Sequence, residues 1–432
     1  MKERLKTLVL AILVTASLVQ SYVLAYGRPK LDLLAPTNYV PSELGGTQAE
    51  LKDLLYPYQI VLHLGERKHT LLTPFSPQQQ FYKMVYRDFL QKRRFESLRK
   101  LTPENLSDLN WNTIKNENEG IEIRFREAVP MKALQRILDI KTDGDSLDEA
   151  RIDRILIYAN TGSGEPEAYF FTDQATTVYA ARTDMDISEV RKNVAFGQYL
   201  TPYEPHYSDY YLPEKSVPVV RYTVGYEQFT ADELKRSLFV DPNIVKNLQE
   251  KDGSQIYTDA KRGLQLQNER HWLIFTDPVT GPSTGRTGSA ADLDTAIQFI
   301  NQHGGWNSTF LMERLFRSSE EEPNQLVFRQ YRDFLPILGG AEEDLGAIKL
   351  QLVQGAVTSF ERSLIKLNGE ATARHEMELP GGEALWKLVQ SSKHAGDIVD
   401  VFPAYSAKIS DKSVELIPRW AVELRDGTYD FL

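Results

Sequence analysis

The stretch from Thr7 to Gly27 carries no charged residue and follows a basic leader that contains Lys2, Arg4 and Lys6. About 20 apolar residues, at roughly 1.5 Å rise per residue, span the hydrocarbon core of a bilayer. Positive charge before such a segment places the leader in the cytoplasm and the following chain outside. The stretch therefore predicts a single transmembrane anchor, with about 400 residues exported behind it.

A cleaved secretory signal is the alternative interpretation of this stretch. Val23-Leu24-Ala25 fits the small-residue pattern of a cleavage site. However, the uncharged stretch is longer than the roughly 7–15 residues usual for a signal core. A retained anchor is favoured, and cleavage after Ala25 stays open.

One face of the anchor predicts a contact with a partner inside the bilayer. Ser17, Ser21 and Ala25 recur every four residues, and Gln20 lies beside them. Small residues at that spacing allow close approach of two helices in lipid, and a glutamine side chain can hydrogen-bond across. The alternative is a passive anchor that tolerates small residues.

The overall composition excludes some classes of function. The chain has a net charge of −10, whereas a nucleic-acid binder normally carries a basic patch or stripe. The basic cluster Lys92, Arg93 and Arg94 falls at the predicted end of a helix, where cations suit the dipole. There is no cysteine, which excludes disulfides, a thiol nucleophile and thiolate metal sites.

The patterning predicts an α+β fold of mixed helices and mainly antiparallel sheets behind the anchor. Ile121, Ile123 and Phe125 alternate with charged residues, which is typical of a half-buried strand. The predicted parts are residues 1–28 for the leader and anchor, 29–218 for a first domain with its linker, 219–321 for a middle domain and 322–432 for a C-terminal domain.

Several helices are predicted from their start signals. A capping box needs Ser or Thr followed three residues later by Glu or Gln, and proline suits the first helical position. Ser76 with Pro77 and Gln79 fits this pattern, as does Thr230 with Glu233. Further helices are predicted after Asp241-Pro242, after Ser289, around 187–194 and over 383–390.

The predicted linker, from Tyr199 to Pro218, is rich in tyrosine and proline. Such a cluster could form a stacking platform for cell-wall sugars. Tyrosines next to prolines also fix a connection between domains by packing, and this second interpretation is favoured.

No motif predicts catalysis, a metal or a cofactor. The seven histidines lack the i, i+4 pairing of a zinc helix, so packed or surface histidines are expected. The turn at Asp143, Gly144 and Asp145 lacks the carboxylate that a calcium loop needs at its twelfth position. The loop from Gly281 to Ser289 is one residue short of a phosphate loop.

Motifs in the middle of the chain resemble the YycH family, regulators associated with the YycG (WalK) sensor kinase of low-GC Gram-positive bacteria. The motifs are Leu238-Phe239-Val240-Asp241-Pro242, Glu250-Lys251-Asp252-Gly253, Ile256-Tyr257-Thr258-Asp259, Arg262-Gly263-Leu264-Gln265, Phe275-Thr276-Asp277-Pro278, and, further on, Phe328-Arg329-Gln330-Tyr331 with Pro336-Ile337. The plan of a basic start, one spanning helix and a large exported part is also similar to this family.

The resemblance implies a regulator that is not an enzyme. It implies association with a YycG/WalK-type kinase and with a YycI-like membrane protein, in control of cell-wall metabolism. It carries no catalytic residues, no cofactor and no metal. A cell-wall protein that binds or processes peptidoglycan is the alternative function.

Overall fold

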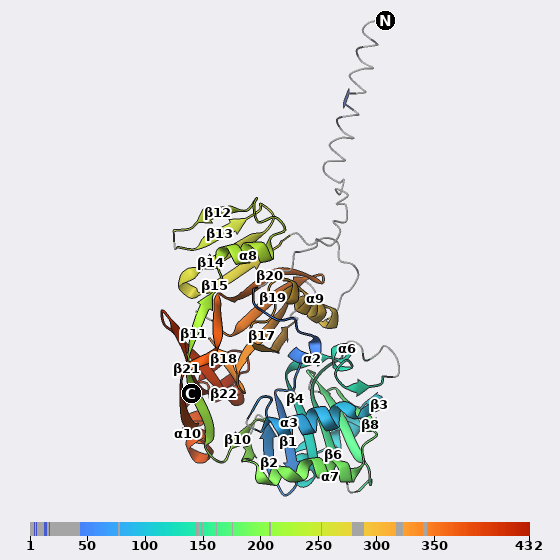
Figure 1. The fold of residues 1–432 in the computed structure, drawn as a ribbon. Coiled ribbons are helices and arrows are strands. Elements are labelled where there is room, and N and C mark those ends of the chain that lie inside the picture. The colour runs from blue at the N-terminus through green and yellow to red at the C-terminus, as the bar shows by residue number, and fades with distance from the viewer. Residues whose placement is uncertain are drawn as a thin grey trace. The chain divides into compact units, whose positions relative to one another are not determined.

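The computed structural model describes residues 44–76, 78–142, 147, 150–160, 162–174, 176–206, 209–251, 253–278, 289–316, 323–339 and 344–432, and the single positions 4, 6, 13, 14 and 17 (Figure 1). Most of the predicted anchor therefore lies outside the described residues. Among the residues that are described, no helix is long and apolar enough to cross a bilayer.

The first half of the chain behind the predicted anchor builds a ten-stranded sheet in the order β10-β9-β2-β1-β4-β6-β7-β8-β3-β5. All neighbours are antiparallel except β3 and β5. The strands are β1 Gln59–Leu64, β2 His69–Leu72, β3 Arg94–Lys100, β4 Glu119–Pro130, β5 Asp139–Ile140, β6 Arg151–Ala159, β7 Pro166–Thr172, β8 Val178–Thr183, β9 Pro202–Pro205 and β10 Tyr211–Pro213.

Helices cover both faces of this sheet. On one face, α7 packs on β1, β4 and β6, and its Val190 and Val194 join a core that contains Ile121 and Ile155. On the other face, Trp111 and Ile114 of α5 pack against Leu156. The helical segments of this half are α2 Leu51–Leu54, α3 Gln79–Lys83, η1 Met84–Phe89, η2 Leu90–Lys92, α4 Pro103–Ser107, α5 Trp111–Glu117, α6 Met131–Leu134, α7 Ile187–Ala195 and η4 Phe196–Tyr199.

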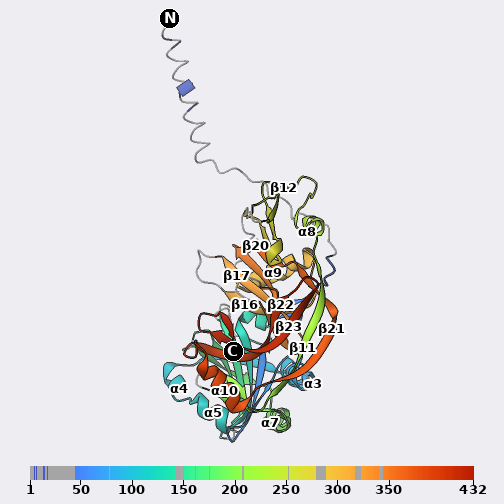
Figure 2. The same cartoon turned by 90° about the vertical axis from the view of Figure 1, so that its left-hand side faces the viewer.

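The second half builds a 14-stranded sheet, and β18 and β22 are the one parallel pair among the described strands of this second sheet. Its long strands β11 and β21 run side by side (Figure 2). The elements are β11 Val217–Gln228, α8 Ala231–Leu238, β12 Lys246–Gln249, β13 Gln255–Thr258, β14 Gly263–Gln267, η5 Asn268–Arg270, β15 Trp272–Thr276, α9 Ser289–Gln302, β16 Thr309–Phe316, β17 Asn324–Arg332, β18 Leu335–Leu338, β19 Ala347–Val353, β20 Ala356–Ser363, β21 Ile365–Leu379, α10 Gly382–Ser391, β22 Ile398–Ile409, β23 Ser413–Leu424 and β24 Tyr429–Phe431.

The two large sheets and their helices confirm the predicted mixed α+β class, with mainly antiparallel pairing. The anchor and the domain boundaries stay predictions. Strands on either side of the boundary at 321/322 pair with each other, since β15 pairs with β20 and β11 pairs with β21.

The start signals are partly confirmed. The capping box of Thr230 and Glu233 opens α8, because the Thr230 hydroxyl accepts from the Glu233 N–H at 3.3 Å and the Glu233 carboxylate accepts from the Thr230 N–H at 2.8 Å. The helix predicted after Asp241-Pro242 is wrong. There the Asp241 carboxylate accepts from the Asn243 N–H at 2.9 Å, an Asx turn that leads the chain into β12 instead.

Candidate functional site

The charged side of β4 is buried rather than solvated. The alternation from Ile121 to Phe125 does form a strand, but Glu122 is fully buried and Arg124 is only 7% exposed. The expectation of a half-buried strand is therefore wrong for this side. The physical reason is that α5 and the predicted linker cover it and bring charges of their own, so that burial is compensated by pairing.

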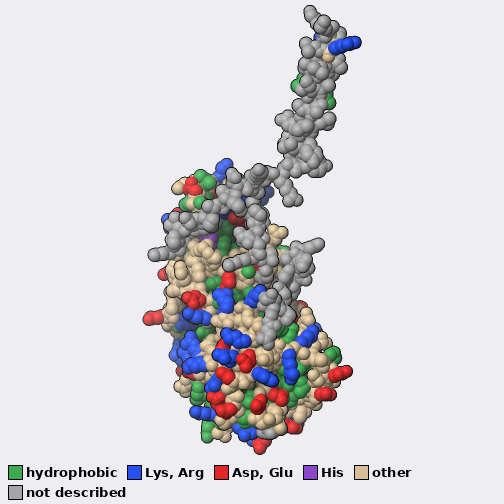
Figure 3. All heavy atoms as spheres, turned by 90° about the vertical axis from the view of Figure 1, so that its right-hand side faces the viewer, with side chains coloured by type: hydrophobic (Ala, Val, Ile, Leu, Met, Phe, Trp, Pro, Cys, Tyr) green, Lys and Arg blue, Asp and Glu red, His purple; other side chains and the backbone are tan. Residues whose placement is uncertain are grey.

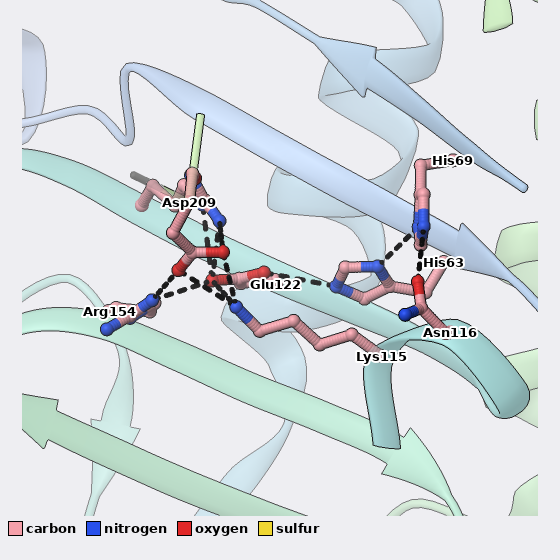
Figure 4. A network of polar contacts seen from close by, with 8 residues as sticks. His63, His69, Lys115, Asn116, Glu122, Arg154 and Asp209 are labelled. Atoms are coloured by element: carbon pink, nitrogen blue, oxygen red, sulfur yellow. Dashed lines mark hydrogen bonds and ion pairs between the residues drawn. The ribbon is translucent and has the colours of Figure 1, made fainter. Parts of the chain in front are cut away.

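Glu122 lies at the centre of this network (Figure 4). Its Oε1 atom is 3.4 Å from Lys115 Nζ, 3.0 Å from Arg124 Nη2 and 3.5 Å from Arg154 Nη1. Burial alone would raise the pKa of Glu122, but Arg124 and Lys115 overcome this and hold its pKa well below the usual value. The carboxylate is thus ionised and shared by three cations.

Asp209, in the predicted linker, is the second carboxylate of the network. Lys115 Nζ donates to both of its oxygens, at 2.9 and 3.0 Å, and Arg154 Nη1 also donates to it. Burial would raise the pKa of Asp209, yet Arg124 leads the cations that lower it. Two carboxylates therefore face three cations.

A pair of buried histidines joins Glu122 from the other side. His63 Nε2 is 3.1 Å from Glu122 Oε2, the two Nδ1 atoms of His63 and His69 are 3.0 Å apart, and His69 Nε2 is 3.0 Å from Asn116 Oδ1. Burial lowers the pKa of His63, and burial together with the neighbouring His63 lowers that of His69 to about 4. Both rings are consequently neutral at pH 7. They therefore add no charge to a network that already has three cations for two carboxylates.

The predicted linker is an ordered part of the first sheet. Its β9 pairs with β2, and β10 pairs with β9. Tyr210 and Tyr211 are buried, and the Tyr211 ring lies 5.4 Å from the His69 ring and 4.9 Å from the Arg124 guanidinium carbon. Packing by these two tyrosines is confirmed; Tyr199 is 82% exposed. Tyr207 lies outside the described residues.

The junction between the two sheets contains a second buried network. Arg126 of β4 donates to Glu423 of β23 at 2.9 Å and lies 3.8 Å from Asp400 of β22. Its guanidinium also stacks over Tyr58 and Phe402, at 4.4 and 4.0 Å from the ring centroids. Burial raises the pKa of Glu423 to about 7 against the opposing effect of Arg126, and burial also raises that of Asp400.

A cavity of about 110 Å³ lies beside Arg126. Both sheets and the linker line it with aromatic rings, including those of Tyr58, Tyr203, Tyr211, Phe402 and Trp420. Its volume is smaller than the roughly 150 Å³ of an engineered apolar cavity that binds benzene. The linker thus contributes to the Glu122 network and to this cavity.

The other predicted sites have mixed outcomes. Ser17 is helical and exposed, whereas Gln20, Ser21 and Ala25 are outside the described residues. The calcium-like turn at 143–145 and nearly all of the loop at 281–289 also lie outside them. In the part of the chain that can be described, no cluster of His, Asp or Glu suits a metal ion, and His63, His69 and His303 are packed in the interior.

The basic cluster of Lys92, Arg93 and Arg94 is engaged in ion pairs. Lys92 ends η2 and lies 3.8 Å from Asp88, Arg93 contacts Glu189 at 2.5 Å, and Arg94 contacts Asp139 at 3.3 Å. These ion pairs make the cluster part of a mixed-charge surface. On the face drawn in Figure 3, too, Lys and Arg side chains are interspersed with Asp and Glu.

Comparisons with known proteins place this architecture among described relatives. The model of the YycH protein N-terminal domain matches residues 3–197, and that of the YycH protein C-terminal domain matches 207–430. The two-component system WalR/WalK regulatory protein YycH of Bacillus subtilis (strain 168) is 22% identical over 324 residues, covering 70% of this chain and 68% of that protein. The crystal structure of YycH from Bacillus subtilis superposes with a TM-score of 0.71 at 16% identity, covering 89% of this chain and 98% of the other, so the two share a fold.

Proposed function

The chain belongs to the YycH family, as its motifs predicted, and we propose that it is a membrane-anchored extracytoplasmic regulator of a WalK-type sensor kinase. It acts by association with the kinase and with a YycI-like membrane protein, and not by catalysis. The observation that carries this proposal is that the two family models together match nearly the whole chain, and that a relative 22% identical over 324 residues is a WalR/WalK regulatory protein.

The chemistry of the buried groups supports action by association. Lys115, Arg124 and Arg154 pair with Glu122 and Asp209, and Arg126 pairs with Glu423. These groups are engaged with one another and hold strands and the linker together. Such networks favour a defined arrangement of elements, which a binding protein requires.

Co-purification from membranes tests the proposal. The intact chain should co-purify with the WalK-type kinase, and replacing segment 8–26 by an unrelated spanning helix should reduce the yield of the complex. Retention of the exported part on purified peptidoglycan, with no recovery of the kinase in either case, would instead support a cell-wall protein.

A narrower version tests the small-residue face of the anchor. Ser17→Leu with Ser21→Leu should weaken the complex, because bulky side chains prevent close helix approach. Thr15→Leu with Val19→Leu is the matched control, since these positions have the same spacing on the opposite side of a helix. Equal recovery of both double variants would remove the role of this face.

A further inference from the structure

Three cations from three separate elements converge on the carboxylate of Asp209. Lys115 comes from α5, Arg124 from β4 and Arg154 from β6. Lys115 Nζ lies 2.9 Å and Arg124 Nη2 lies 3.3 Å from Asp209 Oδ1, and Arg154 Nη1 contacts Oδ2. A point where three positive groups meet is suited to an anion, and guanidinium groups match the geometry of a carboxylate.

The two carboxylates of the network differ in how they are held. Glu122 belongs to β4, is completely inaccessible and is also bonded to His63. The Asp209 side chain is 39% exposed and comes from a turn between β9 and β10, outside any regular element. Asp209 is therefore the outer carboxylate, which can leave without breaking a strand.

The backbone at Asp209 is also unusual. Its φ is +65°, in the left-handed region that non-glycine residues rarely adopt, although Asp tolerates it better than most. Arg124 Nη1 donates to the Asp209 carbonyl at 2.5 Å and helps to hold this conformation. The charge contacts thus maintain a backbone conformation that the residue by itself disfavours.

The cations have donor capacity beyond what Asp209 uses. Among the described residues, the buried Arg154 Nε atom has no hydrogen-bond partner. Arg124 Nη2 also makes no hydrogen bond, but it lies 3.0 Å from Glu122 Oε1 and 3.3 Å from Asp209 Oδ1 as ion pairs. Arg124 as a whole is more than nine-tenths buried. Without Asp209, a surplus of buried cations would face Glu122 alone, which is costly unless another anion enters.

We propose that Lys115, Arg124 and Arg154 form a carboxylate-binding site that the chain's own Asp209 fills. The carboxylate of another molecule binds there when Asp209 withdraws. This inference does not depend on the proposed kinase partner. It has a structural consequence, because Asp209 lies in the segment whose Tyr210 and Tyr211 pack in the interior. Exchange of the carboxylate therefore frees the turn at Asp209, next to these packed rings.

Chemical rescue tests the site on the full chain. Asp209→Ala empties the site, and acetate is the probe. Acetate should raise the melting temperature of this variant relative to chloride at equal ionic strength, and leave the unsubstituted chain unchanged. Asp139→Ala is the matched control, because Asp139 also contacts one lysine and one arginine and its side chain is 38% exposed.

The expected effect is an apparent acetate affinity about tenfold or more higher in Asp209→Ala than in Asp139→Ala, as expected for hydrogen bonds between charged groups. If acetate raises the melting temperature of Asp209→Ala no more than that of the control, the carboxylate of Asp209 only holds its own segment in place. The proposed binding site is then refuted. Should Asp209→Ala fail to fold, Asp209→Ser keeps a small polar residue and is titrated in the same way.

Two further probes define the chemistry of the ligand. An acidic peptide that contains glutamate should bind to Asp209→Ala, and its glutamine counterpart should not. Inorganic phosphate should bind no better than acetate. Binding of phosphate without binding of acetate would overturn the carboxylate assignment. Loss of kinase association with acetate rescue intact would instead count against the proposed function alone.

Discussion

The two buried networks differ in the balance of their charges. The Glu122 network has three cations for two carboxylates, whereas at the junction Arg126 is the one cation among the described residues that forms ion pairs with Glu423 and Asp400. The surplus cations of the first network are accompanied by neutral histidines, with the pKa of His69 lowered to about 4. The surplus carboxylates of the second have raised pKa values, about 7 for Glu423.

Burial affects the pKa values in both networks. In each network it disfavours the charged form of the group that has no opposite charge left to pair with. In the first sheet that form is the imidazolium, and at the junction it is the second carboxylate. The first network therefore resists protonation and should lose stability in acid, since a further proton would add to a surplus of positive charge. The junction resists deprotonation and should lose stability as the pH rises, since a lost proton would add to a surplus of negative charge.

Among the substitutions of charged residues, the largest effect is expected from Glu122→Gln. Removing the central carboxylate leaves Lys115, Arg124 and Arg154 with Asp209 alone, and an uncompensated buried charge costs about 3–5 kcal/mol. Urea denaturation at pH 7 measures the loss in the free energy of unfolding.

The control is Glu415→Gln, which removes the ion-pair partner of Arg221. The Arg221 side chain is 44% exposed and that of Glu415 is 30% exposed. Such a pair contributes only about 0.2–1 kcal/mol. Equal losses in the two variants would show that the Glu122 network is no more important for stability than a surface pair.

Arg126→Met should have the next largest effect, about 3 kcal/mol at pH 8, because it leaves two buried carboxylates without their cation. The loss should be smaller at pH 6, since Glu423 and Asp400 can then take up protons. Denaturation at the two pH values measures the difference. A loss that is independent of pH would mean that the contacts of Arg126 with the rings, and not its charge, join the two sheets.

The dependence of stability on pH should have opposite signs in the two networks. The folded pKa of Glu423, about 7, lies above its unfolded value of about 4.3. Its contribution is fully present below pH 4.3 and is lost as the pH rises through 7, by up to about 4 kcal/mol. The folded pKa of His69, about 4, lies below its unfolded value of about 6.5. Its contribution is present above pH 6.5 and is lost as the pH falls through 4.

Melting temperatures of two variants between pH 4 and 8 measure these slopes. Glu423→Gln should flatten the decline on the alkaline side, and His69→Gln should flatten the decline on the acid side. If both substitutions change the melting temperature on the same side of the pH profile, the two networks do not have opposite pH dependences, and the proposed contrast is wrong.

The sequence predicted the elements better than it predicted the network. Alternation identified β4, and the capping box at Thr230 identified α8, because both signals lie within a few neighbouring residues. The burial of Glu122 could not be predicted in this way. A strand whose charged side faces water and one whose charged side is paired in the interior have the same pattern.

The partners of Glu122 come from other elements, and local patterns do not reveal them. Arg154 gave one signal that could have been used, since it stands in a strand that is otherwise rich in buried apolar residues. Asp209 gave none, because an acidic residue in a polar segment is ordinarily solvated. The turn at Asp241 was misjudged because Asp-Pro starts helices and Asx turns alike.

The smallest effect is expected in the segment that joins the networks, from Tyr199→Ser. Its side chain is 82% exposed, so the substitution should change the free energy of unfolding by less than about 0.5 kcal/mol. Tyr211→Ser, in the same segment, should cost about 3–5 kcal/mol, because its buried ring packs on His69 and Arg124. Urea denaturation of both variants measures the contrast. A large loss of unfolding free energy for Tyr199→Ser would mean that this tyrosine also stabilises the segment. The exposure of a tyrosine in this segment would then not predict its contribution to stability.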